Sequence, residues 1–102
     1  MPPHLLEIRR TGPGSFALEG ELDIETVDRF ESSVDELSGR GDPVVLDLAG
    51  LTFLDSTGVR SLVALGRRLD ERRIVLRGAA ANVRRTLAIA GIHGRLGITV
   101  EP

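Results

Sequence analysis

The sequence predicts an α/β fold, in which short strands alternate with amphipathic helices along a chain of 102 residues. Two observations predict it. Short apolar runs bounded by Gly, Pro or Asp recur along the chain, and between them lie segments whose apolar residues are three or four positions apart. The order is β-β-α-β-α-β-α-β, so we expect residues 1–102 to form a single domain with a mixed four- to five-stranded sheet and three helices.

The first elements are a hairpin and a helix. Leu5–Arg9 and Ser15–Glu19 are expected strands, and the short turn Thr11–Gly14 between them predicts that they pair as a hairpin. A helix follows Gly20-Glu21-Leu22-Asp23, and Gly39–Pro43 ends it. Its expected core positions are Val27, Phe30, Val34 and Leu37.

The middle of the chain predicts a buried strand and a second helix. Val44–Leu48 is almost continuously apolar, which is typical of a central strand covered on both faces, and Ala49–Leu54 is expected to be a connection. Asp55–Gly58 opens the second helix, and Ile74–Leu76 is the next strand. The expected core positions of this helix are Val59, Leu62, Val63, Gly66 and Leu69.

The last elements are a helix over Asn82–Ala90, with Val83, Leu87 and Ala90 inward, and a strand over Ile98–Val100. The strand–helix–strand units predict parallel pairing with right-handed crossovers. The N-terminal hairpin makes the sheet mixed. The sequence leaves open whether all the helices cover one face of the sheet.

Composition excludes several function classes. The chain has no Cys, and its 13 basic residues are all Arg, so Cys-ligated metals, Schiff-base lysines and Walker A lysines are ruled out. The net charge of −2 offers no general attraction to nucleic acid. No apolar run is long enough to cross a membrane and Met1–His4 is unlike a signal peptide, so we expect a cytoplasmic protein without a cofactor.

The segment Asp55-Ser56-Thr57-Gly58 combines polar residues and a glycine where the second helix begins. One interpretation is helix capping, because Asp and Ser side chains accept hydrogen bonds from free backbone N–H groups. The other is a modification site. A hydroxyl at a helix N-terminus is exposed, and a phosphate there is stabilised by the helix dipole while it reverses the local surface potential.

Catalytic interpretations find little support, and we expect a protein that is not an enzyme. Ser56, Asp70 and His93 occur in the order of an α/β-hydrolase triad, but no Gly-x-Ser-x-Gly elbow is present. With only His4 and His93 as histidines, no metal site is expected. The arginines at the end of the second helix form either a solvated face or a docking patch for an acidic partner; they are Arg67, Arg68, Arg72 and Arg73.

Several ordered motifs resemble the STAS domain of bacterial anti-sigma factor antagonists. They are Gly20-Glu21-Leu22-Asp23, Leu46-Asp47-Leu48, Phe53-Leu54-Asp55-Ser56-Thr57-Gly58-Val59, and Val83-Arg84-Arg85-Thr86-Leu87 with Gly91-Ile92. The resemblance covers nearly the whole chain. Two features differ from it: Arg60 stands where many members have a small residue, and the sequence stops at Glu101-Pro102, straight after the last expected strand, where the family usually adds a C-terminal helix.

The resemblance implies a function in bacterial signalling and transcription regulation. Such proteins bind an anti-sigma factor that is also a serine kinase, which releases the sigma factor; phosphorylation of the antagonist separates the complex, and a phosphatase resets it. By resemblance, Ser56 is the phosphorylated residue, with Thr57 as the neighbouring alternative acceptor, and the partner-binding residues are Asp23, Asp55, Ser56, Thr57 and Gly58.

The resemblance also implies a monomer when free, without direct contact to nucleic acid. The alternative role is a cytoplasmic STAS subunit that regulates a membrane transporter, such as an ABC lipid-transport system.

Overall fold

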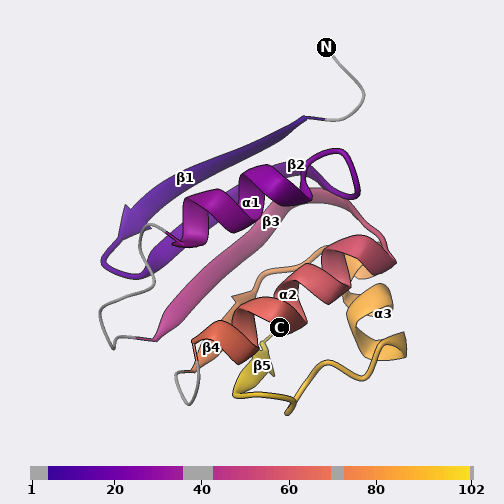
Figure 1. The fold of residues 1–102 in the computed structure, drawn as a ribbon. Coiled ribbons are helices and arrows are strands. Elements are labelled where there is room, and N and C mark those ends of the chain that lie inside the picture. The colour runs from indigo at the N-terminus through magenta and orange to yellow at the C-terminus, as the bar shows by residue number, and fades with distance from the viewer. Residues whose placement is uncertain (1–4, 36–42, 70–72, 102) are drawn as a thin grey trace.

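The computed structural model describes residues 5–35, 43–69 and 73–101 (Figure 1). The elements follow the predicted order: β1 (Leu6–Gly12), β2 (Ser15–Leu22), α1 (Val27–Asp35), β3 (Val44–Leu54), α2 (Ser56–Arg68), β4 (Ile74–Arg77), α3 (Ala81–Ile89) and β5 (Ile98–Val100). The expected core position Leu37 and most of the Gly39–Pro43 helix end lie outside the described residues.

The five strands form one mixed sheet in the order β1-β2-β3-β4-β5. β1 and β2 pair antiparallel as the predicted hairpin, and Gly14 in their turn has a φ of 69°, which glycine adopts without strain. β2 to β5 are all parallel. Each crossover therefore joins a strand to the next one in the sheet, and all three move across the sheet in the same direction. Right-handed crossovers of this kind put every helix on the same face of the sheet.

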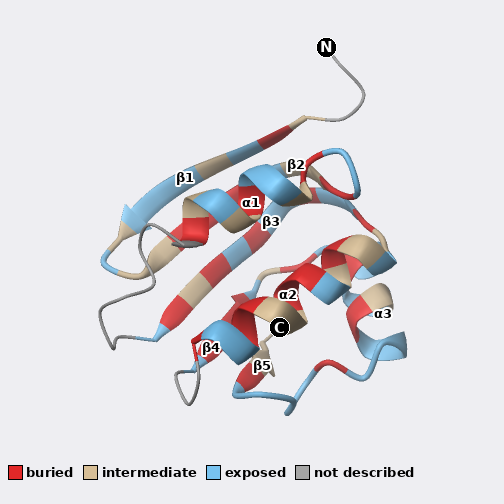
Figure 2. Cartoon of the chain, viewed as in Figure 1, coloured by how far each residue is buried: buried red, intermediate tan, exposed pale blue. Residues whose placement is uncertain are grey.

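The core lies between the helices and one face of the sheet (Figure 2). α1 contributes Phe30 and Val34, α2 contributes Leu62 and Leu65, and α3 contributes Val83 and Leu87 to a single cluster of buried residues. In Figure 1, α1 and α2 lie in front of the sheet and α3 lies beside α2. The sequence left open whether all the helices cover one face of the sheet. In the structure they do, so the domain has two layers, and all three helices contribute to one core.

β3 corrects two predictions. It runs through Leu54, because Ala49–Leu54 pairs with the second half of β2 instead of forming a connection. Its burial alternates: Leu46 and Leu48 are buried, while Asp47 is exposed on the other face. β3 is central in the sheet, as predicted, but it is covered on one face only, because all three crossovers place their helices on the same side.

All three helices differ from their predicted core positions. In α1 the first residue, Val27, is only partly buried and lies outside the core cluster. In α2 the buried stripe includes Leu65, which the prediction omitted, whereas Val59 and Val63 are only partly buried. In α3 the expected inward residue Ala90 is exposed, because the helix ends at Ile89. Ile92, beyond the following turn, is buried at this end of the helix instead.

Candidate functional site

The candidate site lies where β2 and β3 end side by side. Leu22 and Leu54 are register partners at the carboxyl ends of these parallel strands. Asp23 and Asp55 are the next residue along each strand, and the backbone N–H of Asp55 donates to the carbonyl of Leu22 over 3.5 Å. The fold therefore brings two of the predicted site segments, 32 residues apart in sequence, to one edge of the sheet.

Asp55 is the N-cap of α2, as the capping interpretation predicts. Its backbone is extended, with φ −109° and ψ −174°, and its Oδ1 accepts from the backbone N–H of Gly58 at 3.0 Å. The carbonyl of Asp55 accepts from the N–H of Val59, also at 3.0 Å. The Asp55 side chain thus satisfies one of the four N–H groups that a helix leaves without an intrahelical acceptor, and its carbonyl accepts the first intrahelical hydrogen bond of α2.

Gly58 allows this first turn to close on the strand ends. A Cβ atom at Gly58 would lie 2.6 Å from the carbonyl oxygen of Leu22 and 2.6 Å from Leu54 Cδ1. The first of these atoms is backbone and cannot rotate away. The start of α2 can therefore pack this closely against the strand ends only because residue 58 has no side chain. Packing thus explains why a glycine stands at this position.

Asp23 is buried, with 3% of its surface exposed, and it organises the turn into α1. Its Oδ1 accepts from the N–H of Glu25 at 2.9 Å, and its own N–H donates to Thr26 Oγ1 at 3.1 Å. The Thr26 hydroxyl in turn donates to the carbonyl of Glu21 at 2.8 Å. These contacts fix the turn and leave Ile24, which is 71% exposed, on its outside.

Ser56 and Thr57 begin α2. Ser56 is exposed and Thr57 is partly buried, and neither hydroxyl makes a hydrogen bond within the part of the chain that the structure describes. Their backbone N–H groups belong to the first turn, where no intrahelical acceptor exists. An exposed hydroxyl beside free N–H groups at a helix N-terminus can carry a phosphate without loss of an existing contact.

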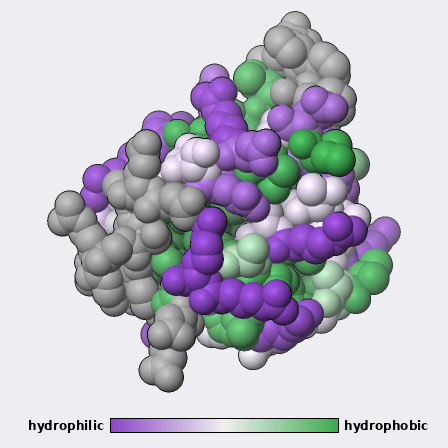
Figure 3. Space-filling view, viewed as in Figure 1, coloured by the Kyte–Doolittle hydropathy of each residue, from purple (hydrophilic) through white to green (hydrophobic). Residues whose placement is uncertain are grey.

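A shallow groove runs from Ser56 along the outer side of α2, and the sequence did not predict it. Its first part, about 340 Å³, is lined by residues of α2 and α3 that include Ser56, Arg60 and Ile89. Its second part, about 410 Å³, continues past Arg67 and is also lined by Arg95. Figure 3 shows hydrophobic surface between long hydrophilic side chains on this side of the molecule.

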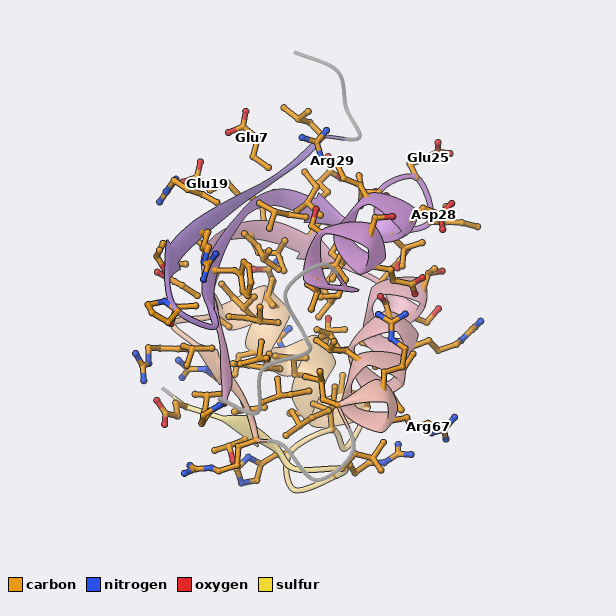
Figure 4. The ribbon with its side chains drawn as sticks, turned by 60° about the vertical axis from the view of Figure 1, so that its left-hand side comes forward. Glu7, Glu19, Glu25, Asp28, Arg29 and Arg67 are labelled. Carbon is orange, nitrogen blue, oxygen red and sulfur yellow. The ribbon has the colours of Figure 1, made fainter. Side chains whose placement is uncertain are left out.

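The α1 side of α2 exposes charges of both signs, whereas the charged residues that line the described groove on the other side are all arginines. α1 packs on one side, where Ser61 of α2 donates to Glu31 at 3.2 Å and where Glu25 and Asp28 are exposed near the start of α1. The groove, with its arginines, lies on the other side. Figure 4 shows Glu25 and Asp28 pointing outward at one end of the helical layer and Arg67 pointing outward at the other.

Of the residues in the catalytic interpretation, Ser56 and His93 lie within the described ranges. The Nδ1 atom of His93 accepts from the backbone N–H of Val100 at 2.9 Å and so helps to hold β5. His4 and Asp70 lie outside the described residues. Within 5–35, 43–69 and 73–101, no group of three His, Asp or Glu side chains could hold a metal ion. In the same residues, no helix is long and apolar enough to span a bilayer.

Comparison with known proteins identifies the fold. Residues 9–100 match the family model described as "Mlab, STAS domain". A solved structure, that of the anti-sigma factor antagonist SpoIIAA in its unphosphorylated form, superimposes with a TM-score of 0.71 over 96% of this chain and 89% of that chain, at 20% sequence identity. No curated protein sequence matches.

Proposed function

We propose that this chain, which belongs to the STAS domain family, is an anti-sigma factor antagonist that binds an anti-sigma factor with serine kinase activity. Binding would release the sigma factor, and phosphorylation of Ser56 by the bound kinase would end the interaction. The chain acts by binding and accepts the phosphate without catalysing its transfer. A single-domain monomer in the bacterial cytoplasm and a phosphatase that resets Ser56 belong to the same proposal.

The observation that carries the proposal is the environment of Ser56. The side chain is exposed at the first position of α2, makes no hydrogen bond within the described residues, and lies beside the turn that Asp23 holds. A kinase can reach such a hydroxyl without unfolding the helix. Thr57 is only partly exposed, which favours Ser56 as the acceptor.

Phosphorylation would change the binding surface without changing the fold. The Ser56 oxygen would bond to the γ-phosphorus of ATP as the bond between that phosphorus and the β-phosphate oxygen breaks. ADP leaves, and the proton of the hydroxyl passes to a catalytic base of the kinase. The new group carries about −1.5 to −2 charges, which the N-terminus of α2 tolerates. In an interface formed with the neutral hydroxyl, this charge would lack a partner, which weakens the complex.

Asp23 supports the proposal indirectly. Because its carboxylate is buried and bonded within its own turn, we assign it the task of presenting the exposed Ile24 and Glu25 next to the α2 N-terminus. Asp55 and Gly58 hold the first turn of α2 at the same edge. The binding surface in this proposal is therefore formed by Ser56 together with the outside of the 23–26 turn.

Phosphorylation and mass spectrometry test the proposal. The purified chain is incubated with ATP and each candidate anti-sigma factor kinase, beside the Ser56→Ala and Thr57→Val variants. We expect one phosphate on the wild type and on Thr57→Val, and none on Ser56→Ala, which should still bind the kinase. A phosphate on Ser56→Ala, or none on the wild type with any kinase, would contradict the proposal.

The second candidate is a STAS subunit that regulates a membrane transporter. The description of the matching family model names Mlab and a STAS domain, and it does not name an anti-sigma factor antagonist, so the family match supports either role. In the second role the chain would co-purify with a membrane complex, and Ser56→Asp would leave this association intact. Anti-sigma factor binding that Ser56→Asp abolishes would favour the first role.

A further inference from the structure

The groove along α2 has an apolar floor at the margin of the core. Val59 and Val63 of α2 are partly buried and pack against the core, Ala64 is partly buried, and Ile89 and Ala90 at the end of α3 are exposed. Ile89 stands out, because 81% of its surface is exposed, more than for the other large hydrophobic residues on the described surface. Contiguous apolar surface with a polar edge is typical of a protein-binding site.

The charged residues that line the described part of the groove are all arginines: Arg60, Arg67 and Arg95. All three are exposed. The whole chain carries a net charge of −2, so this positive edge is a local feature and not a consequence of overall composition. An apolar floor between cationic side chains complements a segment with apolar residues on one face and carboxylates beside them.

The spacing of the arginines indicates the shape of that segment. Arg60 and Arg67 lie about two helical turns apart on one side of α2, or roughly 10 Å along the axis. A second helix packed alongside α2 would present carboxylates to both of them if its acidic residues were also about two turns apart. Its apolar residues between these carboxylates would then face Val63 and Ile89.

We propose that this groove, with its floor of Val59, Val63, Ala64, Ile89 and Ala90 and its edge of Arg60, Arg67 and Arg95, binds an acidic amphipathic helix of a partner protein. The surface extends away from Ser56, which lines only its first part. The sequence offered two interpretations of the arginines at the end of α2, a solvated face or a docking patch for an acidic partner. For Arg67 this proposal favours the docking patch, because Arg67 lines a groove with an apolar floor. The groove requires neither a kinase nor a phosphate.

A designed peptide provides the probe. It is a fluorescent helix of about 20 residues, long enough to be helical in water, with leucines on one face and pairs of glutamates two turns apart beside them. A second peptide has lysine in place of each glutamate. Vesicles of phosphatidylglycerol and phosphatidylcholine provide a third arm, because a cationic apolar groove could also attract an anionic lipid surface.

The variants have matched controls elsewhere on the helical layer. Arg67→Glu and Ile89→Ser alter the groove, whereas Arg29→Glu on α1 and Ile24→Ser in the 23–26 turn make the same chemical changes at exposed positions outside it. All four residues are exposed, so all four variants should fold, which circular dichroism and thermal melting will verify. The phosphate acceptor Ser56 is unchanged in every protein.

We expect the glutamate peptide to bind the wild type, and Arg67→Glu and Ile89→Ser each to weaken binding roughly tenfold, the loss that follows from one buried apolar contact or charge pair. The two controls should bind as the wild type does, and Arg67→Glu should gain affinity for the lysine peptide. The inference is wrong if the glutamate peptide fails to bind, if both peptides bind equally, if the controls lose as much affinity, or if only the anionic vesicles bind. None of these results bears on Ser56 phosphorylation, so the two proposals can fail separately.

Discussion

Replacing Gly58 by alanine tests the packing that builds the candidate site. The added Cβ would lie 2.6 Å from the backbone oxygen of Leu22 and 2.6 Å from Leu54 Cδ1, closer than Cβ atoms approach other atoms in real structures. Relief of this overlap requires the start of α2 to move away from the strand ends. Overpacking of this kind costs about 1–3 kcal/mol, and the better helix propensity of alanine offsets no more than about 1 kcal/mol.

We therefore expect Gly58→Ala to lower the free energy of unfolding by about 1–2 kcal/mol. The melting temperature should fall by roughly 5–10 °C, since 1 kcal/mol corresponds to about 4–8 °C in a domain of this size. Urea denaturation followed by circular dichroism measures the first quantity, and a thermal scan measures the second. The transition should stay cooperative with an unchanged m value, because the site lies at the edge of the core.

Gly66→Ala in the same helix is the matched control. The nearest atom to its added Cβ is the Leu96 Cβ at 3.1 Å, on an exposed segment that can adjust by a few tenths of an ångström. We expect a smaller loss of stability there than at Gly58, or none. If Gly58→Ala were as stable as the wild type, or less destabilised than Gly66→Ala, the argument that α2 needs a glycine to close on β2 and β3 would be refuted.

Three further predictions concern the surroundings of the site. Asp55→Ala removes the cap of α2 and should cost about 1 kcal/mol in urea denaturation, with Asp55→Asn close to the wild type; equal losses in both variants would show that capping is not the cause. Thr26→Val leaves the N–H of Asp23 and the carbonyl of Glu21 without their hydroxyl partner and should lower the free energy of unfolding by about 1–3 kcal/mol. Thr26→Ser keeps the hydroxyl and should retain most of this stability. If Thr26→Val were as stable as the wild type, the role given to this turn would be contradicted. Arg9→Ala breaks the exposed ion pair with Glu19, whose atoms lie 3.0 Å apart on the open face of the sheet, and should change the unfolding free energy by no more than about 1 kcal/mol at low salt, so a larger loss would mean that Arg9 has a further structural role.

The element order was predictable because it depends on local patterns. The Thr11–Gly14 turn between two strand-like runs predicts the hairpin that is observed, and the capping chemistry of Asp55 predicts where α2 begins. Each of these signals lies within a few residues of the chain. The sequence could therefore supply the elements, and by resemblance the family, before any tertiary contact was known.

The predictions that failed depend on how the elements pack. The run at Val44–Leu48 is apolar enough for a strand covered on both faces, yet Asp47 is exposed because every crossover places its helix on the same side. Val59 and Val63 were expected in the core, whereas they lie at its margin, because α2 turns Leu62 and Leu65 toward the sheet. Periodicity gives the width of an apolar face, but neighbouring elements decide which part of it is covered.

The candidate site also combines local features that the sequence predicts with packing features that it does not. Ser56 is exposed at a helix N-terminus, as its sequence context predicts, but nothing local indicates that Asp23 is buried and bonded within its own turn. The groove was not predictable, because it needs α3 to lie beside α2 and so bring Ile89 near Arg60. An isoleucine outside the apolar stripe of α3 was the one signal available, and a single exposed apolar residue is too common to carry weight alone.

The affinity of the anti-sigma factor for the two forms of the chain tests the central claim most directly. Titration calorimetry would compare the unmodified protein with protein phosphorylated on Ser56, each against the same anti-sigma factor. We predict that the phosphate weakens binding by a factor of about 100 or more, as expected for a charge left unpaired in an interface at a cost of several kcal/mol. Equal affinity for the two forms would contradict the claim that Ser56 is the switch.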